Sequence, residues 1–194
     1  MLDYKKISPM LIFIFGGSGD LNYRKLNPAL FNLFMDEAMP DNFSIVGIAR
    51  SEYPGDEYEK HLKEGIDNFS RRKDTDNEWG KFSKHISYIP LDVTNGEDYA
   101  KIANFAKDTE AKFGLHPNII FYMAVAPQLV PSIVKNLGTL DICRDTKCTR
   151  IVIEKPFGHD LESAKDMNRM LAKWFAGTNK SNAQSISSGP CGLK

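Results

Sequence analysis

The stretch Leu11-Ile-Phe-Ile-Phe-Gly16-Gly-Ser-Gly-Asp-Leu21 places a short apolar segment directly before a turn rich in glycine. The apolar residues favour a buried β-strand, and the glycines allow a tight bend that a ligand can approach without meeting a Cβ atom. The helix expected next offers unpaired N–H groups and the positive end of its dipole, which bind phosphate. The stretch therefore predicts a nucleotide site, although such a turn can also be a plain connection.

Short apolar segments alternate with longer helical patterns along the rest of the chain. Segments typical of strands occupy residues 11–15, 44–49, 85–90, 118–123 and 150–154. The runs 119–123 and 151–153 are continuously apolar, as in strands that are covered on both faces of a parallel sheet. We therefore predict an α/β fold with a doubly wound parallel sheet.

Two of the expected helices have a recognisable apolar stripe. The helix after the first turn should bury Leu26, Leu30, Leu33 and Phe34, and Pro28 should kink or restart it. A later helix should bury Tyr99, Ile102, Ala103, Phe105 and Ala106. Both stripes fit helices that lie against a sheet.

The composition is that of an ordinary globular chain of 194 residues, enough for one good core. Basic and acidic residues number 25 each, so charge favours neither nucleic acid nor an anionic membrane as partner. Cys143, Cys148 and Cys191 are odd in number and lack metal-ligand spacing, which fits a reducing compartment better than a disulfide framework. We expect a cytoplasmic protein without signal peptide, membrane span or metal. Residues 1–175 should form the domain and 176–194 a disordered, polar tail.

The residues after the second expected strand bear on the type of nucleotide. A P-loop would need Lys and Ser or Thr after its last glycine, whereas Gly19 is followed by Asp20. An acidic residue after the second strand suits the ribose of NAD, and an arginine suits the 2′-phosphate of NADP. Arg50 and Ser51 stand there and favour NADP, while Glu52 leaves room for NAD.

Several motifs in a fixed order now give a resemblance. They are Gly16-Gly-Ser-Gly-Asp-Leu21, Arg24-Lys-Leu26, Pro28-Ala-Leu30, Val46-Gly-Ile-Ala-Arg50, Asp92-Val-Thr94, Phe121-Tyr-Met-Ala-Val-Ala-Pro127 and Ile153-Glu-Lys-Pro-Phe-Gly158. Together they resemble the amino-terminal coenzyme domain of the glucose-6-phosphate dehydrogenase family, over about residues 11–171. The last motif is more diagnostic than the glycine turn.

The resemblance implies a Rossmann-like domain that binds NADP, with the family's substrate domain absent. The positions matched to the pyrophosphate-binding turn are Gly16, Gly17, Ser18, Gly19, Asp20 and Leu21. Further positions matched to coenzyme contacts are Arg50, Ser51, Asp92, Val93, Met123, Ala124, Pro127, Glu154 and Lys155. Lys155 also matches a lysine that touches the sugar phosphate, so glucose 6-phosphate is a further expected partner, and Pro156 matches a proline that sets the geometry between domains. Asn22 departs from the family, which usually has a small residue there.

Plainer roles remain open for some of these residues. Asp92, Thr94 or Asn95 could cap the next helix, which does not exclude a coenzyme contact. Met123 and Phe121 could be core residues, and core is the better interpretation for Phe121. Lys155 could be a solvated charge at the end of a strand.

The residues for catalysis are not found. The family oxidises glucose 6-phosphate with NADP in the pentose phosphate pathway, and its histidine base lies in an Arg-Ile-Asp-His-Tyr-Leu-Gly-Lys-Glu segment that this sequence lacks. His61, His85, His116 and His159 are expected in surface or capping roles. The sequence therefore suggests a truncated or frame-shifted member that binds NADP without catalysis of its own, or a non-catalytic NADP-binding module. An apolar face without its second domain should promote self-association.

Overall fold

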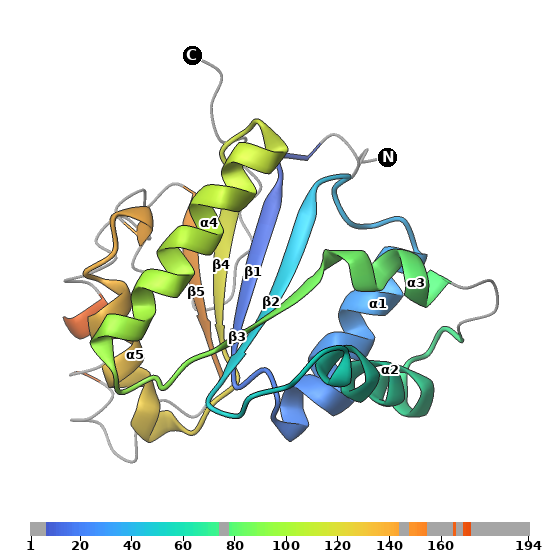
Figure 1. Cartoon of the computed structure of the whole chain (residues 1–194), viewed down its shortest axis with the longest axis horizontal. Helices are drawn as coiled ribbons and strands as arrows, with labels where there is room; N and C mark the ends of the chain where they lie inside the picture. The colour runs from blue at the N-terminus through green and yellow to red at the C-terminus, as the bar shows by residue number, and fades with distance from the viewer. Residues whose placement is uncertain (1–6, 74–77, 144–147, 155–164, 166–168, 172–194) are drawn as a thin grey trace.

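Five parallel strands form one sheet at the centre of the molecule (Figure 1). The structure, a computed structural model, describes residues 7–73, 78–143, 148–154, 165 and 169–171. The strands are β1 (Met10–Phe15), β2 (Phe43–Ala49), β3 (Ile86–Pro90), β4 (Asn118–Met123) and β5 (Thr149–Ile153). Their order is β3-β2-β1-β4-β5, so the chain builds outward from β1 and then crosses over to β4. This confirms the doubly wound α/β fold.

Helices cover both faces of the sheet. A helical segment leaves the glycine turn as a π-helical turn, η2 (Asn22–Leu26), and continues as α1 (Asn27–Met35). The same face carries α2 (Glu57–Phe69) and α3 (Glu78–Phe82), and the other face carries α4 (Ala100–Phe113) and α5 (Val130–Leu137) (Figure 1). The short 3₁₀ turns are η3 (Ser83–His85), η4 (Gly96–Tyr99), η5 (Pro127–Leu129) and η6 (Asp141–Cys143).

Strand alternation divides the core into two hydrophobic clusters. Leu11, Phe13 and Phe15 of β1 point to the α4 and α5 side, and Ile12 and Ile14 point to the side of α1, α2 and α3. Because successive strand side chains point to opposite faces, a continuously apolar strand fills both layers. The prediction for β1 and for the buried core residue Phe121 is confirmed.

The first apolar stripe was predicted only in part. Phe31 is fully buried and Leu26, Leu30 and Phe34 are half-buried, but Leu33 is exposed. The buried positions 22, 27 and 31 are spaced by five and then four residues, because a π turn accommodates one residue more than an α turn. Pro28 lies in the first turn of α1, as expected of a restarted helix. In α4 the predicted stripe is confirmed, with Tyr99 directly before it.

Two further expectations were wrong. Val152 of β5 is 39% exposed and its neighbours Ile151 and Ile153 are only half-buried, because β5 lies at the edge of the sheet in the part of the chain described. Cys143 is a buried free thiol, but Cys148 is disulfide-bonded. The expectation that a reducing compartment fits the cysteines better than a disulfide framework thus did not foresee the disulfide at Cys148.

Among the described residues, no helix is both long and apolar enough to cross a membrane.

Candidate functional site

The turn after β1 lies between β2 and β4, where the strand order reverses. In the sheet register Phe15 stands beside Ile48 of β2 and Met123 of β4. Ligands of open parallel sheets bind in the crevice at this point, outside the carboxyl ends of the strands. The carboxyl ends lie along the lower edge of the sheet in Figure 1.

The first two glycines of the turn touch backbone on both sides. Gly16 has a φ of +83°, and a Cβ on it would lie 2.1 Å from the carbonyl oxygen of Ala124. A Cβ on Gly17 would lie 2.6 Å from Cα of Gly47. The amides of Gly16 and Gly17 both donate to the carbonyl oxygen of Ile48, at 2.8 and 2.9 Å. Only glycine fits at either position.

The outer part of the turn keeps its amide groups available. Gly19 N donates to Gly16 O at 2.8 Å, which closes the turn. Among the described residues, the amides of Ser18, Asp20 and Leu21 donate to no acceptor. N–H groups at the start of a helix bind anions well. The turn therefore has the form of a phosphate site.

A buried asparagine and a buried tyrosine contact the turn from behind. Asn22 is 1% exposed, and its Nδ2 donates to Gly17 O at 2.7 Å and to the Tyr58 hydroxyl at 3.3 Å. The Tyr58 hydroxyl itself donates to Gly17 O at 3.2 Å. Burial raises the pKa of Tyr58 well above its usual value, so this hydroxyl stays a neutral donor. The departure from the family at Asn22 is thus accommodated by hydrogen bonds.

The exit of β2 carries the arginine that was predicted to bind a 2′-phosphate. Arg50, Ser51 and Glu52 are all exposed. The Tyr88 hydroxyl, on β3, donates to Ser51 O at 2.6 Å and to Ala49 O at 3.2 Å. Burial raises the pKa of Tyr88 to about 12, so the hydroxyl remains protonated. Tyr88 thereby holds the backbone on both sides of Arg50.

Asp92, after β3, lies near Arg50. Its Oδ1 accepts hydrogen bonds from the amide and the hydroxyl of Thr94, at 2.9 and 2.7 Å. These bonds, and then the charge of Arg50, hold the pKa of Asp92 below its usual value. The capping role belongs to Asn95, whose side chain accepts from Glu97 N at the start of η4. The capping alternative is confirmed, and Asp92 stays available to a ligand.

Val93 is held through its backbone. Its carbonyl oxygen accepts from the Tyr99 hydroxyl at 2.9 Å and from Ser132 and Asn136 of α5, each at 3.3 Å. Its side chain packs against the core on that face of the sheet. These hydrogen bonds therefore join the loop after β3 to α5, the helix that follows β4.

The predicted residues after β4 and β5 are placed differently. The Met123 side chain is 1% exposed within the core, as in its plainer interpretation, whereas Ala124 is half-buried against Gly16 and Pro127 is exposed. Glu154 accepts a hydrogen bond from the Tyr122 hydroxyl. Lys155 lies outside the described residues.

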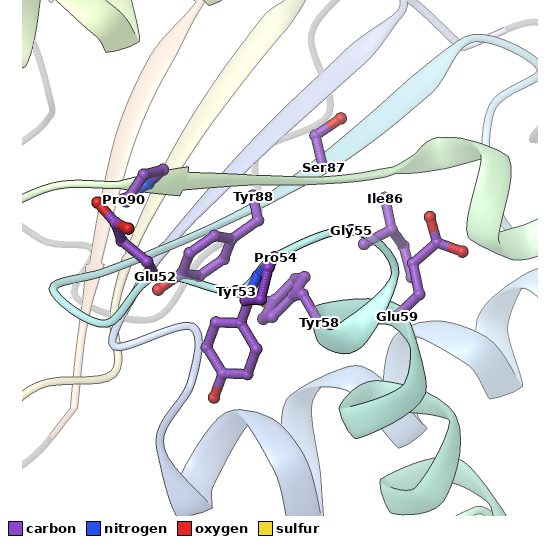
Figure 2. A pocket seen from close by; sticks show the side chains of 10 residues that line it. All are labelled: Glu52, Tyr53, Pro54, Gly55, Tyr58, Glu59, Ile86, Ser87, Tyr88 and Pro90. Carbon is purple, nitrogen blue, oxygen red and sulfur yellow. The ribbon is translucent and has the colours of Figure 1, made fainter.

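A hollow of about 430 Å³ lies beside this site, between β3 and the segment 52–59 that leads into α2 (Figure 2). The rings of Tyr53, Tyr58 and Tyr88 gather in it from a loop, from α2 and from β3, while Ser87 points to the other side of its strand. None of the predicted coenzyme residues lines it. Tyr58 and Tyr88 connect it to the site, since their hydroxyl groups reach the turn and the Arg50 loop.

The described histidines lie away from the crevice. His85 and His116 precede β3 and β4, at the amino ends of the strands. His61 is in α2 with its ring stacked on Tyr23, His85 stacks on Phe43, and both are half-buried. His116 is exposed and bonds Glu110. His159 lies outside the described residues, among which no cluster could hold a metal ion.

Sequence reasoning did not find the tyrosines that support the site. Tyr58, Tyr88 and Tyr122 act through single hydroxyl groups on residues distant in sequence. One signal was present for Tyr58: Gly47 interrupts an apolar strand, and a glycine inside a strand often marks a close approach. A Cβ there would lie 1.9 Å from the Tyr58 hydroxyl oxygen.

Comparisons with known proteins agree with this geometry. The family model described as glucose-6-phosphate dehydrogenase, NAD binding domain, matches residues 13–179. Glucose-6-phosphate 1-dehydrogenase of Leuconostoc mesenteroides is 36% identical over 165 residues, and that of Bacillus subtilis is 33% identical over 165 residues. Each match covers 85% of this chain but 33% of the relative. The chain thus spans about a third of the length of these relatives.

Solved structures show the same likeness. The crystal structure of glucose-6-phosphate 1-dehydrogenase from Mycobacterium avium aligns with a TM-score of 0.72 and 30% identity, covering 85% of this chain and 34% of that one. A glucose-6-phosphate dehydrogenase in complex with its substrate glucose 6-phosphate aligns with a TM-score of 0.74 and 27% identity, covering 91% and 36%.

Proposed function

Because the chain belongs to the glucose-6-phosphate dehydrogenase family, through that family's nucleotide-binding domain, we propose that it binds NADP across the carboxyl edge of its sheet. The single observation that carries the choice of NADP is Arg50, an exposed guanidinium directly after β2. A planar guanidinium donates paired hydrogen bonds to a phosphate, which only NADP carries at the 2′ position.

The remaining predicted residues complete the proposed site. The pyrophosphate would lie against the available amides of Ser18, Asp20 and Leu21, and Asp92 and Val93 would border the adenosine half. Ala124 and Pro127 would line the path toward the nicotinamide, with Glu154 and Lys155 beyond them. Among the described residues, these positions all follow the carboxyl ends of strands. That shared edge supports one extended ligand.

We further propose that the bound NADP serves the oxidation of glucose 6-phosphate to 6-phosphogluconolactone, with Lys155 touching both ligands. This reaction needs a base for the sugar hydroxyl while hydride passes to the nicotinamide. None of the three described histidines lies in the crevice. We therefore propose that the chain by itself binds the coenzyme without turning over the sugar. Its proposed location is the cytoplasm.

The experiment that tests the coenzyme is a titration of NADP and of NAD into the full chain. Wild type should bind NADP more tightly than NAD, and Arg50→Ala should lose that preference while binding NAD as before. Arg71→Ala is the matched control, because Arg71 is an exposed arginine that pairs with Asp36. An Arg50→Ala variant that keeps the preference would refute the role of Arg50.

A non-catalytic NADP-binding module is the second candidate, favoured by the same placement of the histidines. Absorbance at 340 nm with glucose 6-phosphate and NADP separates the two when it is followed for the chain alone and for the chain mixed with the remaining part of a family member. Turnover only in the mixture would exclude the non-catalytic module, and NADP binding without turnover in either case would support it. Self-association through an uncovered apolar face stays a prediction, which a monodisperse monomer in light scattering would contradict.

A further inference from the structure

The carbonyl group of Gly17 receives two hydrogen bonds from the protein side of the turn. One comes from Asn22 Nδ2 at 2.7 Å and one from the Tyr58 hydroxyl at 3.2 Å. The two donors also contact each other at 3.3 Å. We call them the Asn22–Tyr58 pair.

The direction of this carbonyl decides the direction of the next amide. In a trans peptide the C=O of one residue and the N–H of the next point to opposite sides of the plane. Because the Gly17 carbonyl points back toward Asn22 and Tyr58, the Ser18 N–H points away from them. Among the described residues this N–H has no acceptor.

Three elements have to cooperate for this arrangement. Tyr58 reaches Gly17 from α2 only because Gly47 of β2 has no side chain, since a Cβ there would lie 1.9 Å from the hydroxyl oxygen. Asn22 reaches it from η2, and Asn22 Oδ1 is buried with no hydrogen-bond partner among the described residues. An unpartnered buried acceptor disfavours folding, so any gain at this position comes from Nδ2, which bonds Gly17 O and the Tyr58 hydroxyl.

We propose that Asn22 and Tyr58 are positioning residues for the coenzyme: by holding the Gly17 carbonyl inward, they aim the Ser18 N–H at the pyrophosphate. This inference rests on the proposed binding of NADP. It adds that the Asn22–Tyr58 pair orients the turn.

Asn27 offers a matched control on the same helical segment. Asn27 is also 1% exposed, and its Nδ2 also donates to a backbone carbonyl, that of Leu62 at 3.2 Å. In the described part of the chain its Oδ1 also has no hydrogen-bond partner. Its hydrogen bond joins α1 to α2 and does not involve the turn. Asn27→Ala therefore removes a buried amide and its hydrogen bond to a backbone carbonyl, at a position that does not orient Gly17.

The experiment compares two ligands by titration of the full chain, in wild type and in Asn22→Ala, Tyr58→Phe and Asn27→Ala. NADP carries the pyrophosphate, and adenosine 2′-monophosphate lacks it but keeps the 2′-phosphate. Asn22→Ala should lower the affinity for NADP about fivefold and Tyr58→Phe about threefold, because each variant loses a hydrogen bond that orients the Gly17 carbonyl. Neither variant should change the affinity for adenosine 2′-monophosphate. Asn27→Ala should leave the affinity for both ligands unchanged.

The outcomes separate this inference from the proposed function. The inference would be overturned if wild type binds NADP and if Asn22→Ala and Tyr58→Phe bind it as tightly as Asn27→Ala does. That result would leave the proposed function intact. An equal loss of affinity for NADP and for adenosine 2′-monophosphate would also overturn the inference, because it would indicate general damage to the fold. Wild type that binds neither ligand would refute the proposed function, and the inference with it. Tyr58→Phe keeps the ring over Gly47, so its result stands even if Asn22→Ala folds poorly.

Discussion

The turn after β1 is closely packed and held by backbone contacts, whereas the exits of β2 and β3 are open and present their charges on side chains. At the turn, glycines pack against the backbone of β2 and of Ala124, directly after β4. At the exits, Arg50 is exposed and Asp92 is half-exposed. The part of the proposed ligand that NAD and NADP share thus meets closely packed backbone, and the part that differs meets side chains at the surface. Changes at the turn should affect the whole fold, and changes at the exits should affect selectivity.

The strongest test of this contrast is Gly16→Ala. The new Cβ would lie 2.1 Å from Ala124 O at a φ of +83°, so we expect destabilisation by about 3 kcal/mol or more, measured by urea unfolding. Gly55→Ala is the control, because Gly55 also has a positive φ, of +58°, but nothing lies within 4 Å of its Cβ position. That variant should lose only about 1 kcal/mol. Equal losses in both variants would show that the turn is not constrained by β4.

A smaller effect is expected from Tyr88→Phe, at the open side. It removes the hydrogen bonds to Ser51 O and Ala49 O, which flank Arg50. We expect a loss of about 1 kcal/mol in stability and about twofold in the preference for NADP over NAD. Tyr53→Phe is the control, since Tyr53 lines the same hollow (Figure 2) and no described hydrogen bond engages its hydroxyl. If the two variants show the same preference, Tyr88 does not hold the Arg50 loop.

The smallest effect is a pH dependence confined to the open side. The second pKa of a phosphate monoester is about 6, so the 2′-phosphate loses one negative charge as the pH falls from 7.5 to 5.5. Asp92 does not titrate in this window, because the bonds from Thr94 and the charge of Arg50 hold its pKa below the usual value. The preference for NADP over NAD should fall about twofold to threefold. Arg50→Ala should abolish this pH dependence, and its persistence there would assign it to another group.

The strands were predictable because each is a compact apolar run, and all five predicted ranges agree with the structure to within one residue at each end. The buried face of the first helix was not, since the π turn at 22–26 changes the spacing on which the stripe depends. Asn22 and Asn27, both buried there, are polar and carry no signal of burial in the sequence.

The site shows the same division. Residues 16–21, Arg50 and Asp92 could be located from the sequence, because strand ends in a parallel sheet converge on one edge. The supporting contacts could not, because Asn22, Gly47 and Tyr58 come from three elements and meet only in the folded chain. A glycine in mid-strand was the one local sign of them.

The pairing of β1 with β4 also has a consequence for the order of folding. Met10 of β1 pairs with Asn118 of β4, more than one hundred positions later, while its partner in β2 is Phe43. Contacts between distant positions form late, because a long stretch of chain must first be ordered. During synthesis the β1, β2 and β3 half is therefore complete before Ala124 arrives to close over Gly16. In the nascent chain the turn after β1 therefore forms early, and its contact with Ala124 is made only after β4 has been synthesised.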